Sequence, residues 1–165
     1  MKLLAIVSTL VAVGFGAVSA DAATIVALGA SNTRGKGVAI SQAYPAQLQA
    51  ILRAHGKRAT VLNAGINGDT TSHMLSRMNG LLSADTKVVI LQPGGNDRRK
   101  GKTDEQSNVS SIQAKLSGRG IALVMLPNTM LRPKPHQPDG QHLTPEGYHQ
   151  LAEELAASVE GALGR

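Results

Sequence analysis

The sequence has no cysteine and very few aromatic residues: among its 165 residues only Phe15, Tyr44 and Tyr148 are aromatic. Without cysteine the chain cannot form a disulfide scaffold or a zinc-thiolate site, and it cannot use a cysteine nucleophile. Its formal charge of +6 would ordinarily suggest nucleic acid as a partner. Modules that bind single strands stack the bases on aromatic side chains, and this chain has almost none. We therefore expect no nucleic acid partner despite the positive charge.

The first 22 residues have the pattern of a signal peptide. Lys2 supplies a positive start, and a largely apolar stretch follows over residues 3–18. The tripeptide Ala-Asp-Ala that ends at Ala22 resembles a cleavage site, and Val-Ser-Ala, which ends at Ala20, is a second candidate. The apolar stretch is shorter than the roughly 20 residues that span a bilayer, so stable membrane insertion is not expected. We predict a signal peptide over residues 1–22, a single domain over residues 23–165, and export to the periplasm or the medium.

After this segment, short apolar runs alternate with amphipathic segments. The run at 24–28 ends at Gly29 and has the continuous apolar character of a strand buried on both faces. Such alternation predicts an α/β fold: a three-layer sandwich in which helices cover both faces of a mostly parallel sheet. Ligands bind such sheets beyond the carboxyl ends of the strands. The predicted strands are 24–28, 59–62, 87–91 and 121–126, and the predicted helices are 44–55, 70–82, 106–116 and a last one from 145.

Capping residues predict where two of these helices begin. Ser41 is a candidate N-cap for the helix over residues 44–55. Thr144 followed by Pro145 is the usual start of a helix, because threonine caps the first turn and proline fits the first helical position. The last helix is therefore predicted to begin at Pro145 and to bury its aliphatic face.

The loops after the predicted strands carry the groups that acyl transfer by serine requires. That chemistry needs a hydroxyl, a histidine that takes its proton, a carboxylate that orients the histidine, and donors for the oxyanion. Ser31 follows the first strand, glycine-rich loops follow the second and third, and His142 precedes the last helix. Asp139 lies three residues before His142, from where a carboxylate can reach the ring within one turn. The four ingredients are predicted to meet at one edge of the sheet.

Together these loops resemble the four motif blocks of the SGNH hydrolases, also called GDSL-type esterases and lipases. The resemblance covers nearly the whole chain after the signal peptide and is nearest to the short bacterial branch of lysophospholipases, acyl thioesterases and arylesterases. It implies a flavodoxin-like fold, hydrolysis of acyl esters or thioesters through an acyl-enzyme, and no cofactor. Residue by residue, it implies Ser31 as nucleophile, His142 as base, Asp139 as triad acid, and the Ser31 N–H, the Gly68 N–H and the Asn96 side chain as oxyanion donors.

The chain departs from this family pattern at two places. Ala30 stands where the first block has an aspartate that braces the nucleophile loop. Only 42 residues separate Asn96 from Asp139, where the family has a further helix and strand. We therefore expect a trimmed sheet of four to five strands and an open site. The departures leave a non-catalytic ligand-binding homologue as an alternative; a carbohydrate O-deacetylase on the same fold is another, although sugar sites often use aromatic stacking.

Some residues near the motifs have competing interpretations. Gly65 rivals Gly68 as an oxyanion donor. Asp97 is interpreted as a turn residue without a catalytic role. His55 and His73 fall on predicted surface helices and are expected to be solvated.

A metal site is a further alternative for the histidine-rich segment. His136, Asp139 and His142 are spaced three apart, as metal ligands can be. Pro135 and Pro138 would break any helix that aligned them. We therefore expect no metal and no other cofactor.

Six basic residues gather in the two loops that are predicted to flank Ser31. They form either a solvated rim or a surface that steers anionic substrates such as phospholipids, acyl-coenzyme A or acidic polysaccharide. The scarcity of aromatic residues predicts an aliphatic acyl site for a small or lipid-like acyl ester. The six residues are Arg34, Lys36, Arg98, Arg99, Lys100 and Lys102.

Overall fold

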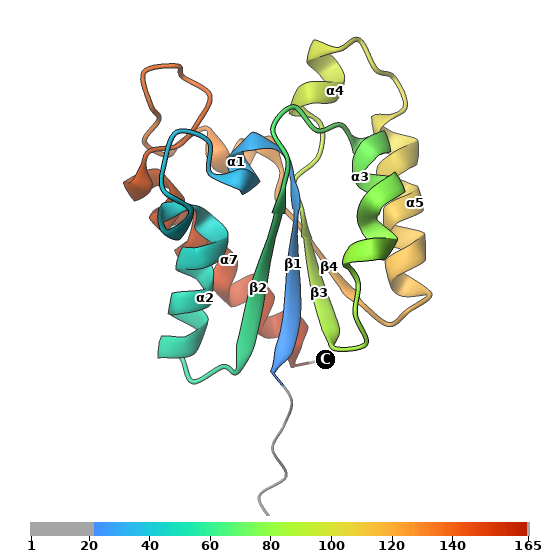
Figure 1. Ribbon diagram of the computed structural model, residues 1–165, viewed down its shortest axis with the longest axis vertical. Coiled ribbons are helices and arrows are strands. Elements are labelled where there is room, and N and C mark those ends of the chain that lie inside the picture. The colour runs from blue at the N-terminus through green and yellow to red at the C-terminus, as the bar shows by residue number, and fades with distance from the viewer. Residues whose placement is uncertain (1–21, 165) are drawn as a thin grey trace, which may run out of the picture.

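Four apolar segments form a single parallel sheet at the centre of the chain (Figure 1). The computed structural model describes residues 22–164, so the predicted signal peptide lies outside the described residues except for Ala22. The strand order is β2-β1-β3-β4, and each neighbouring pair is parallel, as predicted. The sheet has four strands, the smaller of the two numbers expected. The strands are β1 (Ala23–Gly29), β2 (Ala59–Gly65), β3 (Thr86–Leu91) and β4 (Ala122–Met125).

The two central strands are buried on both faces. In β1, Ile25 and Ala27 pack into the core on one face of the sheet, whereas Val26 and Leu28 pack into the core on the other face. All four side chains are fully buried, and β3 divides its residues between the two cores in the same way. This two-sided burial explains why both segments are continuous apolar runs rather than alternating ones.

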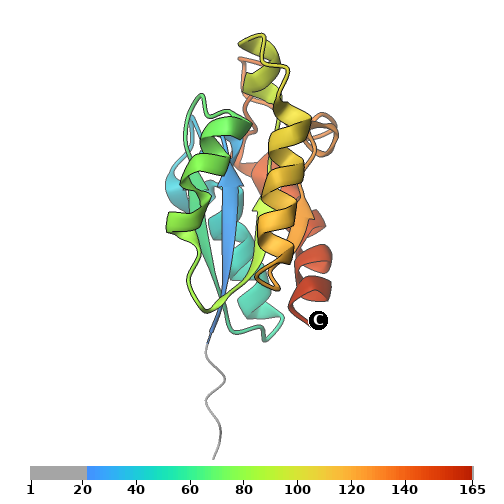
Figure 2. The ribbon, with the colours of Figure 1, turned by 90° about the vertical axis from the view of Figure 1, so that its right-hand side faces the viewer.

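The longer helices form the outer two layers (Figures 1 and 2). Helices α2 and α7 cover one face, and α3 and α5 cover the other. The last helix begins as predicted: Thr144 is its N-cap and accepts a hydrogen bond from the Gly147 N–H. None of the helices described over residues 22–164 combines the length and the hydropathy that crossing a membrane would require. The four helices are α2 (Tyr44–Ala54), α3 (Thr71–Met78), α5 (Glu105–Ser117) and α7 (Pro145–Leu163).

The predicted helix limits were wrong at two places. Ser41 does not cap α2; it lies in a separate 3-10 turn, η1 (Ile40–Gln42), and Ala43 is the N-cap. Helix α3 ends at Met78, and the predicted remainder is another 3-10 turn, η2 (Asn79–Leu81). Asn79-Gly80 explains the early end of α3, because both residues are weak helix formers.

Three very short helices were not predicted, since single turns carry no periodic pattern. Each follows the carboxyl end of a strand. They lie in the loops that carry the predicted site residues. They are α1 (Ser31–Arg34), α4 (Gly95–Arg99), which lies in what was expected to be a loop, and α6 (Asn128–Leu131).

The strand order places a crevice at the carboxyl ends of β1 and β3. From β1 the chain crosses through α2 to β2 on one side, and then through α3 to β3 on the other side of β1. The carboxyl ends of β1 and β3 therefore adjoin loops that diverge to opposite faces of the sheet, which is where ligands bind in such folds. Ser31 follows β1 and Asn96 follows β3, so the topology brings both loops to this crevice.

The only two tyrosines of the chain are buried in the same core, between the sheet and the α2–α7 layer. The Tyr148 hydroxyl donates a hydrogen bond to Asn32 Oδ1 at 3.0 Å, and burial raises its pKa to about 12. The Tyr44 hydroxyl is also buried, but within residues 22–164 no hydrogen-bond partner meets it. Removing the two hydroxyls should therefore have different consequences.

We predict that Tyr148→Phe lowers the free energy of unfolding by about 1 kcal/mol, because a buried acceptor loses a donor. Tyr44→Phe should leave the free energy of unfolding unchanged or raise it, because it removes an unpaired polar group. Urea denaturation of both variants measures the difference. A larger loss for Tyr44→Phe than for Tyr148→Phe would contradict this reading of the core.

Candidate active site

Ser31 begins α1, directly after the end of β1. The turn packs closely on the strand, and a Cβ at Gly29 would lie 2.1 Å from Thr33 Oγ1, so glycine is required there. Thr33 Oγ1 donates to Gln92 Oε1 at 3.0 Å, which ties the turn to the residue after β3. Ser31 is thereby held at the boundary between β1 and β3, at the mouth of the crevice.

His142 is positioned by the loop that precedes α7. The Gln137 N–H donates to the His142 carbonyl at 2.7 Å and closes this loop. Asp139 Oδ1 accepts from the N–H groups of Gln141 (2.9 Å) and His142 (3.0 Å), and Asp139 Oδ2 lies 2.5 Å from His142 Nδ1. The bond to the imidazole, with these two backbone bonds, holds the pKa of Asp139 well below its usual range. Asp139 is therefore a carboxylate at neutral pH.

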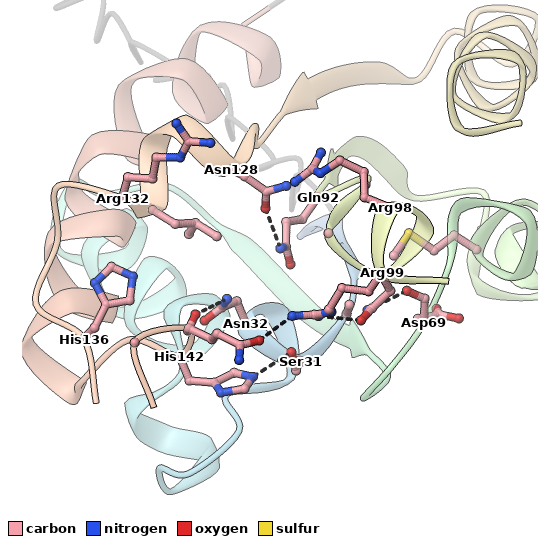
Figure 3. A pocket seen from close by; sticks show the side chains of 18 residues that line it. Ser31, Asn32, Asp69, Gln92, Arg98, Arg99, Asn128, Arg132, His136 and His142 are labelled. Carbon is pink, nitrogen blue, oxygen red and sulfur yellow. Dashed lines mark hydrogen bonds between the residues drawn. The ribbon is translucent and has the colours of Figure 1, made fainter. Parts of the chain in front are cut away.

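The two loops meet at the Ser31 hydroxyl. His142 Nε2 lies 2.9 Å from Ser31 Oγ, within hydrogen-bond reach, while its Nδ1 faces Asp139 (Figure 3). The His142 side chain is 8% exposed, whereas the Asp139 side chain is 44% exposed. The predicted serine, histidine and aspartate thus form a continuous chain of contacts, in the arrangement by which a histidine can take a proton from a hydroxyl.

Asn32 holds these two loops in register, and the sequence analysis missed it. Its Nδ2 donates to the Gln141 carbonyl at 3.0 Å, and its Oδ1 accepts from the Leu143 N–H at 3.3 Å and from the Tyr148 hydroxyl at 3.0 Å. The buried Asn32 side chain therefore binds the backbone on both sides of His142. No local pattern points to partners more than 100 positions away in the sequence.

Asn96, like Ser31, lines the pocket. Its Nδ2 donates to the Asp69 carbonyl at 2.8 Å, and its Oδ1 accepts from Arg99 Nη2 at 2.6 Å. An amide nitrogen has two hydrogens, so one remains for a ligand. Gly68, the residue before Asp69, has a φ of +76°, which favours glycine, and its carbonyl accepts from Lys100 Nζ at 2.7 Å. Asn96 is thus fixed against the turn that contains Gly68.

The rival glycine, Gly65, has a different environment. Its N–H donates to Asn63 Oδ1 at 3.0 Å. A Cβ at this position would lie 2.2 Å from the Arg34 backbone nitrogen, so glycine allows the end of β2 to pack on α1. These contacts explain why position 65 is a glycine, whether or not its N–H binds an oxyanion.

A buried ion pair supports the Gly68 turn. The fully buried Asp69 carboxylate accepts from Arg77 Nε at 2.9 Å and Nη2 at 2.7 Å, and it also contacts His73. Arg77 Nη2 donates in addition to the Ala64 carbonyl at 2.7 Å. The sequence analysis identified neither Asp69 nor Arg77. The His73 side chain is 58% exposed and forms this contact from outside the pocket.

Asp97 is more than a turn residue. It is buried, and its Oδ1 accepts from Thr71 Oγ1 at 2.7 Å and from the Thr71 N–H at 3.1 Å. It therefore ties α4 to the start of α3. It does not line the pocket.

A pocket of about 310 Å³ adjoins Ser31, His142 and Asn96 (Figure 3). Its wall contains both polar and aliphatic side chains, and the aliphatic acyl site stays a prediction. Of the six basic residues predicted to flank Ser31, only Arg98 and Arg99 line it, and Arg132, which was not predicted, lines it too. No three His, Asp or Glu side chains among the described residues are grouped as metal ligands would be. The aliphatic side chains in the wall are Ala30, Met74 and Leu131.

Comparison with known proteins gives consistent matches. The chain is 33% identical over 110 residues to the esterase TesA of Pseudomonas aeruginosa, an alignment that covers 65% of this chain and 55% of TesA. It is 32% identical over 105 residues to an arylesterase of Vibrio mimicus, covering 62% of this chain and 52% of the relative. The chain thus spans about half the length of these curated relatives.

The fold matches a crystal structure of TesA with a TM-score of 0.76 at 24% identity, covering 84% of this chain and 99% of that one. The model of the GDSL-like Lipase/Acylhydrolase family matches residues 27–162, which include the segments that carry Ser31, Asn96 and His142. This match confirms the resemblance seen in the motif blocks. The chain therefore belongs to the GDSL-like lipase/acylhydrolase family.

Proposed function

We propose that this protein is an exported serine esterase that hydrolyses acyl esters or thioesters through an acyl-enzyme. The observation that carries the proposal is the chain of contacts from Asp139 through His142 to Ser31, with distances of 2.5 and 2.9 Å. A serine that served only to cap a turn would not need a histidine at its hydroxyl or a carboxylate behind that histidine. Membership of the acylhydrolase family supports the same chemistry.

In the first half of the reaction, Ser31 Oγ attacks the acyl carbonyl carbon and its proton moves to His142 Nε2. The negative charge of Asp139 holds the ring by its Nδ1–H and stabilises the imidazolium. The tetrahedral intermediate collapses, the bond to the alcohol or thiol breaks, and the leaving group takes the proton from His142. The acyl group remains on Ser31 as an ester.

Water completes the reaction by the same route. It attacks the acyl carbonyl as His142 Nε2 takes its proton, and the second intermediate releases the carboxylic acid while Ser31 Oγ regains the proton. These two half-reactions need no cofactor. In each one His142 passes on the proton that it has accepted, first to the leaving group and then to Ser31 Oγ.

The oxyanion of both intermediates requires hydrogen-bond donors. We assign this role to the Ser31 N–H, the Gly68 N–H and the free hydrogen of Asn96 Nδ2. The first N–H of a helix has no acceptor within the helix, and Ser31 is the first residue of α1. Donors fixed in advance stabilise the oxyanion because they need not reorganise when charge develops. The bonds of Asn96 to Asp69 and Arg99 support such a fixed orientation.

Export follows from the proposed signal peptide over residues 1–22, which leaves residues 23–165 as the mature domain. The resulting destination is the periplasm or the medium. A chain without cysteine suits such an oxidising compartment, because it has no thiol to protect.

Ser31→Ala is the direct test of this activity. It should lower kcat on a 4-nitrophenyl ester by about 10⁴-fold or more, because the nucleophile is lost, while the circular dichroism spectrum stays that of the parent. Ser110→Ala, an exposed serine on α5, is the matched control and should keep the parent rate. A Ser31→Ala protein as active as the parent would refute the proposed nucleophile.

Asn32 is proposed as a positioning residue, because its side chain sets where His142 lies relative to Ser31. Asn32→Leu should lower kcat by about 10–100-fold with a smaller change in KM, since a displacement of about 1 Å can cost a factor of this size. Asn32→Asp, which places a buried carboxylate oxygen against the Gln141 carbonyl, should lower kcat at least as much. Rates are normalised to folded protein, so an unchanged kcat in Asn32→Leu would mean that the residue is only structural.

A further inference from the structure

We propose that Arg98 and Arg132 form an anion-binding subsite at the far side of the pocket from His142. The subsite would select ester substrates that carry a carboxylate or phosphate group away from the scissile carbonyl. This inference rests on the proposed ester hydrolysis and goes beyond it, because it names the chemical class of the substrate.

The first observation is the charge of the pocket wall. Three arginines line the pocket, whereas Asp69 is the only carboxylate among the described residues that do so. The Asp69 side chain is fully buried and bonded to Arg77, so it cannot neutralise the arginines. Asp139 does not line the pocket and faces the His142 ring instead. The wall therefore carries an uncompensated positive charge.

The second observation is that two of these guanidinium groups have no partner among the described residues. Arg99 is occupied, since it donates to Asn96 and Gln141. Within residues 22–164, the side chains of Arg98 and Arg132 take part in no hydrogen bond or ion pair, although both line the pocket. A guanidinium offers five donors in a planar fork that fits a carboxylate or phosphate. Both groups are thus available to an anionic ligand.

The third observation is their position. Arg98 lies on α4 after β3, and Arg132 directly follows α6 after β4. In Figure 3 they flank Asn128, which contacts Gln92, while Ser31 and His142 lie toward the other side of the pocket. A substrate with its carbonyl at Ser31 would direct its distal group toward this polar wall.

Two matched esters test the subsite. Mono-4-nitrophenyl glutarate and 4-nitrophenyl pentanoate have acyl groups of equal length, which end in a carboxylate and a methyl group. We expect the protein to prefer the glutarate in kcat/KM by about 10–100-fold at low salt, the range that a charge-assisted hydrogen bond provides. The preference should lie mainly in KM and should shrink as salt is added.

Charge-removing variants locate the effect. In R98Q/R132Q the ratio of the two kcat/KM values should fall to near one. K57Q/R58Q removes the same charge from exposed residues in the turn between α2 and β2, and it should keep the ratio of the parent. Equal kcat/KM values for the two esters in the parent protein would overturn the subsite. So would an equal fall of the ratio in both double variants. The second result would mean that only the overall positive charge matters.

A binding measurement separates this inference from the proposed activity. Calorimetry on the Ser31→Ala protein should show that free glutarate or inorganic phosphate binds, and that R98Q/R132Q removes this binding. The anion with the lower Kd is the preferred one. If neither ester is hydrolysed but binding depends on these arginines, the subsite stands and the esterase proposal fails. If the neutral ester is hydrolysed through Ser31 and neither anion binds, the subsite fails and the esterase proposal stands.

Discussion

The site depends on the hydrogen bonds by which Asn32 joins the loop after β1 to the loop before α7. Ser31 and His142 come from opposite ends of the domain, and Asn32 binds the backbone on both sides of His142. The side chain is buried, so water does not compete for these bonds, and Tyr148 supplies a third from α7. A brace of this kind does not need a carboxylate at position 30. The chain can therefore have Ala30 and still keep Ser31 and His142 in contact.

The buried pair of Asp69 and Arg77 supports the other side of the site, where Asn96 lies. Arg77 joins the ends of β1 and β2 through the carbonyls of Gly29 and Ala64, while the Asp69 backbone carbonyl orients Asn96. A buried carboxylate is costly unless it is paired, and Arg77 meets that need. The same pairing removes Asp69 from the charge balance of the pocket. The same ion pair therefore has two effects. It supports the Gly68 turn, and it leaves the pocket wall positive because Asp69, the one carboxylate among the described lining residues, is already bound to Arg77.

The elements and contacts that depend on local sequence patterns could be predicted from the sequence. Continuous apolar runs identified β1 and β3, Thr144-Pro145 marked the start of α7, and the spacing of Asp139 and His142 allowed their contact within one loop. Other contacts were beyond such patterns: Asn32 binds residues more than 100 positions away, and Arg77 reaches both Asp69 and the ends of two strands. The basic residues were predicted from loop membership alone. Which of them line the pocket depends on how α4 and α6 fold: Arg98 and Arg99 do, and so does Arg132, which was not predicted.

The central claim is that Ser31 is a nucleophile activated by His142. A fluorophosphonate probe followed by peptide mass spectrometry measures this most directly, because the probe reacts covalently only with an activated serine. We expect a single adduct on the peptide that contains Ser31, and no adduct when His142 is replaced by alanine in a protein that remains folded. Folded parent protein that stays unlabelled, or that is labelled at another serine, would contradict it.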